Sequence, residues 1–260
     1  MKNIFLRIFY FVRKLSILKK PTNSLLRRIL FIIKKDKFLY DFKNIKLFIH
    51  LRDSIDREIF MNGYYEEEQI SLLCSLIDEN SIDYFIDVGA NVGIYSLLIS
   101  KKFLNLKTYA FEPHPHVFKR LQKNINLNNL EDKISTYNYA LSNKLGSSLL
   151  YSRNKFNIKQ SGGATINELG NIKIKTDKGD NLLEFKEKKI AIKIDTEGHE
   201  LFVLEGLKNL LSSNSICLQI EIFPNNVDQV LSFLNKLNFK LIKKSNFTHQ
   251  KEILDYFFIN

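Results

Sequence analysis

Short apolar runs alternate with amphipathic segments along most of the chain. Seven runs have the length and composition of strands: 84–88, 108–111, 134–139, 190–195, 216–222, 239–243 and 254–259. Between them, apolar residues recur every three or four positions and predict helices over 66–77, from 93, over 116–127, after 198 and over 226–237. Strands that alternate with helices of this length indicate an α/β fold with a doubly wound, mostly parallel sheet.

Residues 143–188 interrupt this alternation. They are polar and rich in Gly, Asn and Lys, which predicts an irregular hairpin region or a lid. A run at 47–51 predicts one short strand ahead of the first helix. Ligands bind doubly wound sheets beyond the carboxyl ends of the strands, so we expect the chemistry just after residues 88, 111 and 195.

The first of these strand ends carries a glycine-rich loop that runs from Asp87 to Gly93. Gly89 and Gly93 let the backbone turn tightly and approach a ligand closely, and the next helix offers free N–H groups. The loop lacks the three glycines of the dinucleotide fingerprint and the Gly-Lys-Ser/Thr of a P-loop. An acid followed by Gly-x-Asn-x-Gly suits a ligand with an ammonium or sulfonium charge, and a plain strand-to-helix turn is the alternative.

The second strand end is Phe111-Glu112-Pro113. An acid at this position, about twenty residues after the glycines, can accept hydrogen bonds from both hydroxyls of a ribose. The alternative is a solvated loop acid. Because the spacing and the strand order both fit, the glycine loop and the acid together favour one nucleoside-containing ligand.

The third strand end brings four titratable residues together: Asp195, Glu197, His199 and Glu200. His199 is a candidate general base because the ordinary pKa of histidine lies near neutrality. A packed or surface histidine is the alternative, and acids at a helix start also serve as caps. The acids could hold a divalent cation, but the sequence identifies no further oxygen ligands, and no metal site is predicted.

Together these segments resemble the FkbM-type S-adenosylmethionine (SAM)-dependent methyltransferases. The resemblance extends over about residues 60–224 and rests on Asp87–Ser96, Phe111–Pro115 with Asn124 and Asn128 downstream, Tyr139–Ser142, Ile192–Glu200, Val203–Gly206 and Ile220–Ile222. It implies a class I methyltransferase fold, Rossmann-like, with a seven-stranded sheet whose last strand runs antiparallel. It also implies methyl transfer, usually to a hydroxyl oxygen.

The resemblance further implies a cofactor site made of Asp87, Gly89, Ala90, Asn91, Gly93, Glu112, Pro113, Ala140, Leu141 and Asp195. The glycine loop would cradle the methionine part of SAM, Glu112 would hold the ribose, and Ala140 and Leu141 would lie near the adenine. In-line methyl transfer needs an aligned acceptor, and an alcohol is a poor nucleophile until its proton leaves. The candidate catalytic residues are His199, Asp195 and Glu197, and we expect His199 to remove the proton and Asp195 to provide orientation.

Charge is distributed very unevenly along the chain. Its 260 residues include 39 Lys and Arg against 28 Asp and Glu, a formal net charge of +11. Ten basic residues and no acidic ones fall in residues 1–35, so the rest of the chain carries 29 basic and 28 acidic residues, a net charge of +1. The basic character therefore belongs to the N-terminal segment and says little about the active site.

Apolar residues 4, 8, 11, 15 and 18 share one helical face of that segment, and Pro21 ends the helix. We therefore expect a basic, amphipathic helical extension over 1–45 and a methyltransferase domain over 46–260. Such a helix is typical of binding to an anionic membrane surface, and packing on the domain or on a partner chain is the alternative. Its apolar runs of five residues are too short to span a bilayer, and no signal peptide is predicted.

The predicted activity is SAM-dependent O-methylation of a hydroxyl on a sugar, a glycan or a lipid-linked glycan precursor. A nucleic-acid methyltransferase is one alternative. The net charge of the domain is close to zero, which does not favour nucleic acid as a partner. In addition, amino-methylating enzymes carry Asn/Asp-Pro-Pro-Tyr/Phe at the position where this chain has Asp195-Thr-Glu-Gly198. A membrane-associated protein that binds the cofactor without turnover is the other alternative. We expect Cys74 and Cys217 to be buried free thiols in a cytoplasmic protein, peripheral on the inner face of the membrane if the extension binds lipid. The oligomeric state stays open.

Overall fold

A computed structural model describes Arg28 and residues 36–152, 154–155, 158–159, 162–245 and 253–260. Apart from Arg28, residues 1–35 of the predicted basic helical extension lie outside the described residues. In the described part of the chain, no helix is both long and apolar enough to cross a bilayer. Cys74 and Cys217 are buried free thiols, as predicted.

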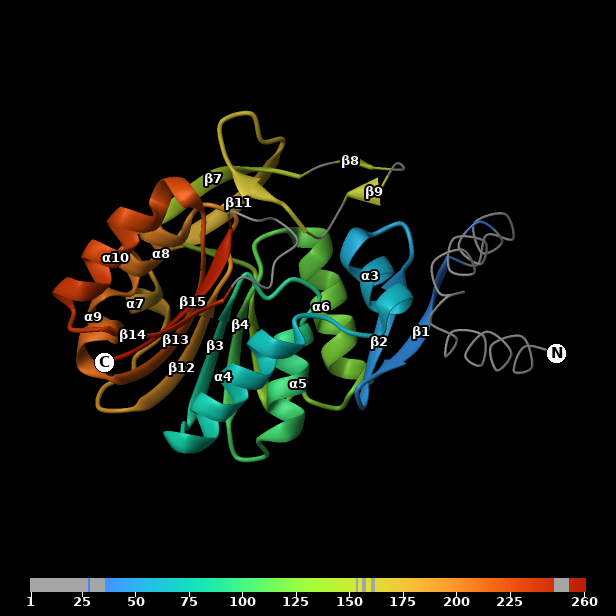
Figure 1. Cartoon of the computed structure of the whole chain (residues 1–260). Coiled ribbons are helices and arrows are strands. Elements are labelled where there is room, and N and C mark those ends of the chain that lie inside the picture. The colour runs from blue at the N-terminus through green and yellow to red at the C-terminus, as the bar shows by residue number, and fades with distance from the viewer. Residues whose placement is uncertain (1–27, 29–35, 153, 156–157, 160–161, 246–252) are drawn as a thin grey trace.

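A seven-stranded sheet runs through the middle of the domain (Figure 1). In spatial order its strands are β14 (Lys240–Ser245), β15 (Leu254–Ile259), β13 (Ser215–Ile222), β12 (Lys189–Ile194), β3 (Tyr84–Val88), β4 (Lys107–Phe111) and β5 (Ile134–Tyr137). The strands from β13 to β5 pair in parallel, and β15 runs antiparallel to both of its neighbours. The predicted α/β fold with a mixed sheet is therefore confirmed.

Helices cover both faces of this sheet (Figure 1). One face is covered by α4 (Glu67–Glu79), α5 (Ile94–Lys102) and α6 (Pro115–Leu127). The other face is covered by α7 (Gly179–Leu182), α8 (Glu200–Gly206), α9 (Lys208–Ser213) and α10 (Val227–Lys236). The 3-10 turn η2 (Pro224–Asn226) precedes α10. Strands covered on both faces are apolar almost throughout. In β12, every residue after Lys189 is buried.

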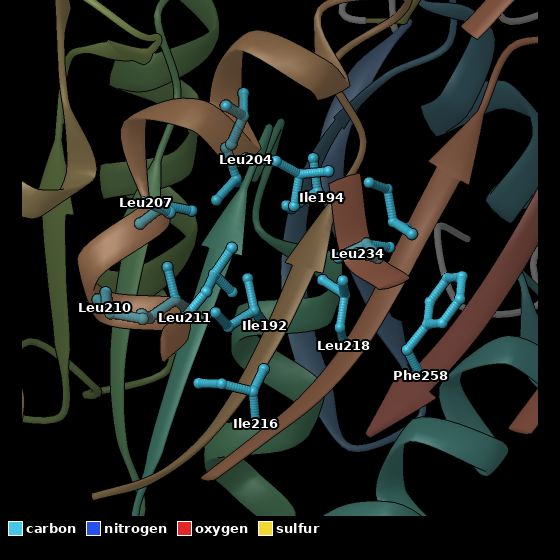
Figure 2. Packing of buried hydrophobic residues seen from close by; sticks show 14 of the residues in the cluster. Ile192, Ile194, Leu204, Leu207, Leu210, Leu211, Ile216, Leu218, Leu234 and Phe258 are labelled. Carbon is cyan, nitrogen blue, oxygen red and sulfur yellow. The ribbon is translucent and has the colours of Figure 1, made fainter. Parts of the chain in front are cut away.

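Figure 2 shows the core between the central strands and the helices α8, α9 and α10. The labelled side chains are Ile192 and Ile194 of β12, Ile216 and Leu218 of β13, Phe258 of β15, and Leu204, Leu207, Leu210, Leu211 and Leu234 of the covering segments. Each fully buried aliphatic side chain stabilises the fold by about 1.5–3 kcal/mol relative to an exposed one. This packing makes β12 and β13 a firm base for the residues that follow them.

Ahead of the first predicted helix lies a β-hairpin, made of β1 (Lys37–Phe42) and β2 (Ile45–His50) and followed by α3 (Ser54–Asn62). Lys43 and Asn44 form its turn with φ of 45° and 68°. A two-residue turn with two positive φ values matches the twist of a hairpin, and Asn tolerates that conformation well. The helical extension predicted up to residue 45 is therefore wrong for residues 37–45, where the alternation of Phe38, Tyr40 and Phe42 has the period of a strand.

The hairpin is held on α6 by two asparagines. Oδ1 of Asn124 accepts a hydrogen bond from the backbone N–H of Phe48 at 2.8 Å, and Oδ1 of Asn128 accepts one from Lys46 at 2.9 Å. The side-chain amide of Asn128 also donates to the carbonyl of Lys46 at 2.8 Å. These side chains satisfy backbone groups of β2 that β1 leaves unpaired, so the hairpin is part of the domain and covers one end of it.

A second, smaller sheet stands beyond the carboxyl ends of the main strands (Figure 1). It contains β6 (Ala140–Leu141), β7 (Gly146–Tyr151), β10 (Thr165–Ile166) and β11 (Ile172–Asp177) in the order β10-β7-β11-β6, and β8 (Asn154–Lys155) pairs with β9 (Ile158–Lys159) beside it. The region predicted as an irregular hairpin region or lid is thus largely an ordered sheet. Its polar composition arises because the strands bury one face only, as the alternating burial along β11 shows.

Candidate active site

A cavity opens between the carboxyl ends of the main strands and the small sheet. The strand ends contribute Gly89, Ala90, Asn91, Glu112, Pro113, Lys193, Asp195, Glu197, His199 and Glu221. The small sheet and its loops contribute Tyr139, Ala140, Leu141, Leu150, Gly162, Gly163, Ala164 and Ile166. Tyr65 and Glu66, from the loop before α4, and Tyr95 of α5 close the remaining side.

The main strands end in register at this cavity. Ile194 of β12 pairs with Ile220 of β13 and with Val88 of β3, and Val88 pairs with Phe111 of β4. The next residue of each strand stands at the cavity, in the spatial order Glu221, Asp195, Gly89 and Glu112. Adjacent strands lie about 4.8 Å apart, so three carboxylates and the glycine loop form one row along the sheet edge.

Gly89 is the point at which two strand ends touch. Its φ is +80°, and a Cβ built on it would lie 1.9 Å from the carbonyl oxygen of Asp195. Asn91 at φ +53° and Gly93 at φ +91° also have left-handed backbone, and α5 begins directly after Gly93. The tight loop therefore brings the backbone of residues 89–91 to the cavity wall.

Asp87 and Gly93 lie behind the loop and are not on the cavity wall. Asp87 is 1% exposed, and its Oδ2 accepts hydrogen bonds from the backbone N–H of Ser96 at 3.1 Å and from its hydroxyl at 2.6 Å. A Cβ on Gly93 would meet Leu121 of α6 at 2.6 Å. Both residues shape the loop, whereas the other eight predicted cofactor residues lie on the cavity wall.

Glu112 connects two loops at the second strand end. Its Oε2 accepts a hydrogen bond from the backbone N–H of Asn91 at 3.0 Å, and its Oε1 accepts one from His114 at 2.8 Å. Burial raises the pKa of Glu112 to about 7, although these two hydrogen bonds oppose the rise. Each carboxylate oxygen can accept a second hydrogen bond, so Glu112 can still bind a pair of hydroxyls.

Lys193 is a buried ammonium group among these acids. It projects from β12, its Nζ lies 2.9 Å from Oδ2 of Asp195, and it stands 4.9 Å from the ring centre of Tyr95. Burial alone would lower the pKa of Lys193, but the carboxylates of Asp195, Asp87 and Glu66 raise it above its usual value. The amine therefore stays charged and compensates part of the negative charge of the site.

A chain of hydrogen bonds lies beneath Lys193. The hydroxyl of Tyr95 donates to Oε2 of Glu66 at 2.8 Å and accepts from Nε2 of Gln219 at 3.0 Å. Gln219 also donates to Oδ1 of Asp255 at 3.0 Å. Burial raises the pKa of Glu66 to about 7. Glu66 has a left-handed backbone, with φ of 40°, which brings its side chain from the start of α4 into the site.

Glu197 and His199, two of the predicted catalytic residues, are both engaged by the walls of the cavity. Oε1 of Glu197 accepts a hydrogen bond from the backbone N–H of Gly163 at 2.8 Å, which ties the small sheet to the main one. Nε2 of His199 shares a hydrogen bond with the hydroxyl of Ser142 at 3.0 Å, and the ring stacks on Phe202. Burial lowers the pKa of His199 to about 4. His199 is thus a neutral and weakly basic group near pH 7.

Among the described residues of the cavity wall, three charged ones have no predicted role: Glu66, Lys193 and Glu221. Lys193 and Glu221 are charged residues inside strands that are otherwise buried, and such residues usually have a charged partner or a function. That signal is visible in the sequence. Glu66 has no comparable local signal, because its approach depends on how the loop before α4 crosses the sheet.

The family model of the methyltransferase FkbM domain matches residues 87–241, a span that contains the glycine loop and every strand end of the row. The chain belongs to the FkbM methyltransferase family. SAM is the cofactor of this FkbM protein. The cavity fits it, because five carboxylates and one ammonium group from the described residues line the wall, which favours a positively charged sulfonium. Oδ1 of Asp87, buried behind the loop and without a hydrogen-bond partner among the described residues, adds to this negative field.

Named relatives of this FkbM protein include methyltransferases from an archaeon and a fungus. The hexuronic acid methyltransferase AglP of Haloferax volcanii is 34% identical over 172 residues, which cover 64% of this chain and 68% of the relative. The methyltransferase sdnD of Sordaria araneosa is 28% identical over 184 residues, or 59% of this chain and 68% of the relative. Among solved structures, TYW2 of M. jannaschii in complex with AdoMet is 12% identical, with a TM-score of 0.46 over 86% of this chain and 87% of that chain. A similarity that low assigns no function.

The buried carboxylates predict a pH dependence of stability in the absence of SAM. Burial raises the pKa of Glu66, Glu112 and Glu197 from 4.5 to about 7, and that of Glu221 to about 10, so the folded state holds these protons more tightly than the unfolded chain. Their stabilising contribution is present at low pH and is lost as the pH rises, through 7 for the first three and towards 10 for Glu221. The lowered pKa values of His50 and His199 act in the opposite direction, but only below about pH 6.5.

We therefore expect the free energy of unfolding in urea to fall by about 3–6 kcal/mol between pH 6.5 and pH 8.5. The substitution Glu66→Gln removes one of the titrating groups and should reduce that difference. A free energy of unfolding that stays constant or rises over this pH range would contradict the raised pKa values of these carboxylates.

Proposed function

We propose that this protein transfers the methyl group of SAM to a hydroxyl oxygen of a sugar, in a glycan or a lipid-linked glycan precursor. The observation that carries the proposal is the division of the cavity at Asp195. On one side lie the glycine loop, Glu112 and Ala140, which suit a nucleoside and a sulfonium. On the other side lies Glu221 of β13, and the hydroxyl of Tyr95 bonds both Glu66 and Gln219 of the same strand. Carboxylates accept hydrogen bonds from sugar hydroxyls, and aromatic rings pack against sugar rings.

In this proposal the chain's own residues bind, orient and exclude water. The backbone of residues 89–91 holds the methionine part, Glu112 accepts hydrogen bonds from the ribose hydroxyls, and Ala140 and Leu141 pack near the adenine. When bound, SAM supplies a methyl group on a positively charged sulfur. Asp195, held by Lys193 at 2.9 Å, is the residue that orients the acceptor between the two sides.

The relatives and the N-terminal charge support the class of acceptor. AglP is a hexuronic acid methyltransferase by name, so a sugar substrate occurs in a relative of 34% identity. Residues 1–35 carry ten basic residues and no acid. Binding of that segment to an anionic membrane would hold the enzyme at its cytoplasmic face, beside a lipid-linked acceptor.

Transfer of labelled methyl groups tests the proposal. The protein is incubated with SAM labelled in the methyl group and with glycan and lipid fractions of the organism that encodes it. We expect the label to enter a sugar-containing fraction and to remain there after treatment with mild alkali. A methyl ether is stable to base, whereas a methyl ester is not. Label that alkali releases would identify a carboxyl acceptor and overturn the hydroxyl assignment. Label in nucleic acid, or no transfer to any fraction, would overturn the sugar assignment.

A further inference from the structure

We propose that the carboxylate of Glu221 accepts the proton of the acceptor hydroxyl during methyl transfer. The proposal rests on the proposed function, since only a hydroxyl acceptor has a proton to lose. Glu221 is the single charged residue of β13. It lies in the row of strand ends, immediately beside Asp195. It lies on the side of Asp195 away from Gly89 and Glu112, which places it beyond the cofactor residues and toward the acceptor.

Glu221 differs from the other acids of the cavity in what its oxygens bind. The other four carboxylates on the wall already accept hydrogen bonds: Asp195 from Lys193, Glu197 from the backbone of Gly163, Glu66 from Tyr95, and Glu112 from two backbone N–H groups. No group of the described residues donates a hydrogen bond to the carboxylate of Glu221. Both of its oxygens are therefore available to a hydroxyl in the cavity.

The surroundings of Glu221 make it a stronger base than an exposed glutamate. Its pKa is raised to about 10, first by burial and then by the negative charges of Asp195, Glu197 and Asp255, while Lys193 opposes the rise. Asp255 of β15 pairs directly with Glu221 across the sheet. A sulfonium bound on the far side of Asp195 adds a positive charge, which favours the ionised carboxylate and readies it to accept a proton.

The step balances without any further reactant. The O–H bond of the acceptor breaks, and its proton passes to an oxygen of Glu221. The electron pair left on the acceptor oxygen forms the new bond to the methyl carbon, and the electron pair of the carbon–sulfur bond stays on the sulfur, which becomes a neutral thioether. His199 is the weaker candidate for this proton, because its pKa is lowered to about 4 and its Nε2 faces Ser142.

The test compares Glu221→Gln with Glu131→Gln, a matched change at an exposed position near β5. For Glu221→Gln we expect label transfer to the alkali-stable product to fall by about 10²–10⁴-fold. The acid limb of the pH–rate profile should disappear from the residual activity, and calorimetry at pH 7 should give a SAM dissociation constant no more than about tenfold weaker, because a cofactor that lowers the pKa of Glu221 binds its ionised form more tightly. Glu131→Gln should match the unchanged protein in all three measurements. Glu221→Asp, which keeps the charge, should recover part of the lost rate.

A second readout does not depend on turnover. In protein labelled with carbon-13 at the glutamate side-chain carboxyls, one resonance should titrate well above pH 7 without SAM. It should shift to lower pH with SAM and be missing from Glu221→Gln. A rate within threefold of normal for Glu221→Gln, a SAM affinity more than about a hundredfold weaker, or a resonance that SAM leaves unchanged would each overturn the role of Glu221. Alkali-labile label would instead overturn the hydroxyl acceptor itself, so the two failures are distinguishable.

Discussion

Replacement of Lys193 by methionine should destabilise the folded protein by about 3–5 kcal/mol at pH 7.5, measured by urea unfolding. Methionine keeps much of the aliphatic volume of the side chain but removes the ammonium group. Asp195 and Asp87 then lose the buried positive charge of Lys193 beside them, and Asp87 is 1% exposed. Loss of one partner of a buried ion pair costs more than the pair itself contributes, because the remaining charge is left without compensation.

The cause of this loss can be separated from a packing defect. If uncompensated charge is responsible, the loss should become smaller at pH 5.5, because burial raises the pKa of Asp87 and this carboxylate takes up a proton more readily as the pH falls. Lys189→Met at the exposed start of the same strand should change stability by no more than about 0.5 kcal/mol. A loss for Lys193→Met that is equal at both pH values would indicate lost packing and contradict the electrostatic account.

Replacement of Gly89 by alanine should have the second large effect. The added Cβ would lie 1.9 Å from the carbonyl oxygen of Asp195, and the φ of +80° is unfavourable for alanine. Because the obstacle is backbone, the ends of β3 and β12 must move apart. We expect a loss of stability of about 3 kcal/mol, and a SAM affinity at least tenfold weaker by calorimetry, since the shifted loop also forms part of the cofactor site.

Gly198→Ala is the matched control for the close approach. Gly198 also has a positive φ, of +100°, at the loop after β12, but a Cβ there would meet no atom within 4 Å. This change should therefore cost only the backbone strain, about 1–2 kcal/mol. Equal losses for the two substitutions would show that strain alone explains the glycine at position 89.

The order of strands and helices could be predicted because it depends on local periodicity. A buried parallel strand is a short apolar run, and a covering helix shows a repeat of 3.6 residues, so each main-sheet strand is within two residues of its expected place. The hairpin at 37–50 was missed in part because the basic segment before it has a helical pattern. The small sheet was missed because strands with one exposed face are polar in composition.

Much of the candidate site could also be predicted, for a topological reason. The carboxyl ends of parallel strands meet at one edge of a sheet, so Gly89, Glu112 and Asp195 must come together once the strands are identified. The hydrogen-bond partners of Glu197 and Glu66 are not predictable, because they lie 34 and 29 residues away in the chain. The approach of Gly163 to Glu197 and of Tyr95 to Glu66 depends on how the loops pack.

The sequence by itself thus determined the α/β fold, the FkbM resemblance and the row of acids at the strand ends, because strand direction and register place them at one edge. Only the tertiary structure decided what each acid does there. Lys193 forms an ion pair with Asp195, Gly163 donates a hydrogen bond to Glu197, and no group of the described residues donates one to Glu221. The proton affinity of a carboxylate depends on its burial, neighbouring charges and hydrogen bonds, and all three are set by residues that meet only in the folded protein.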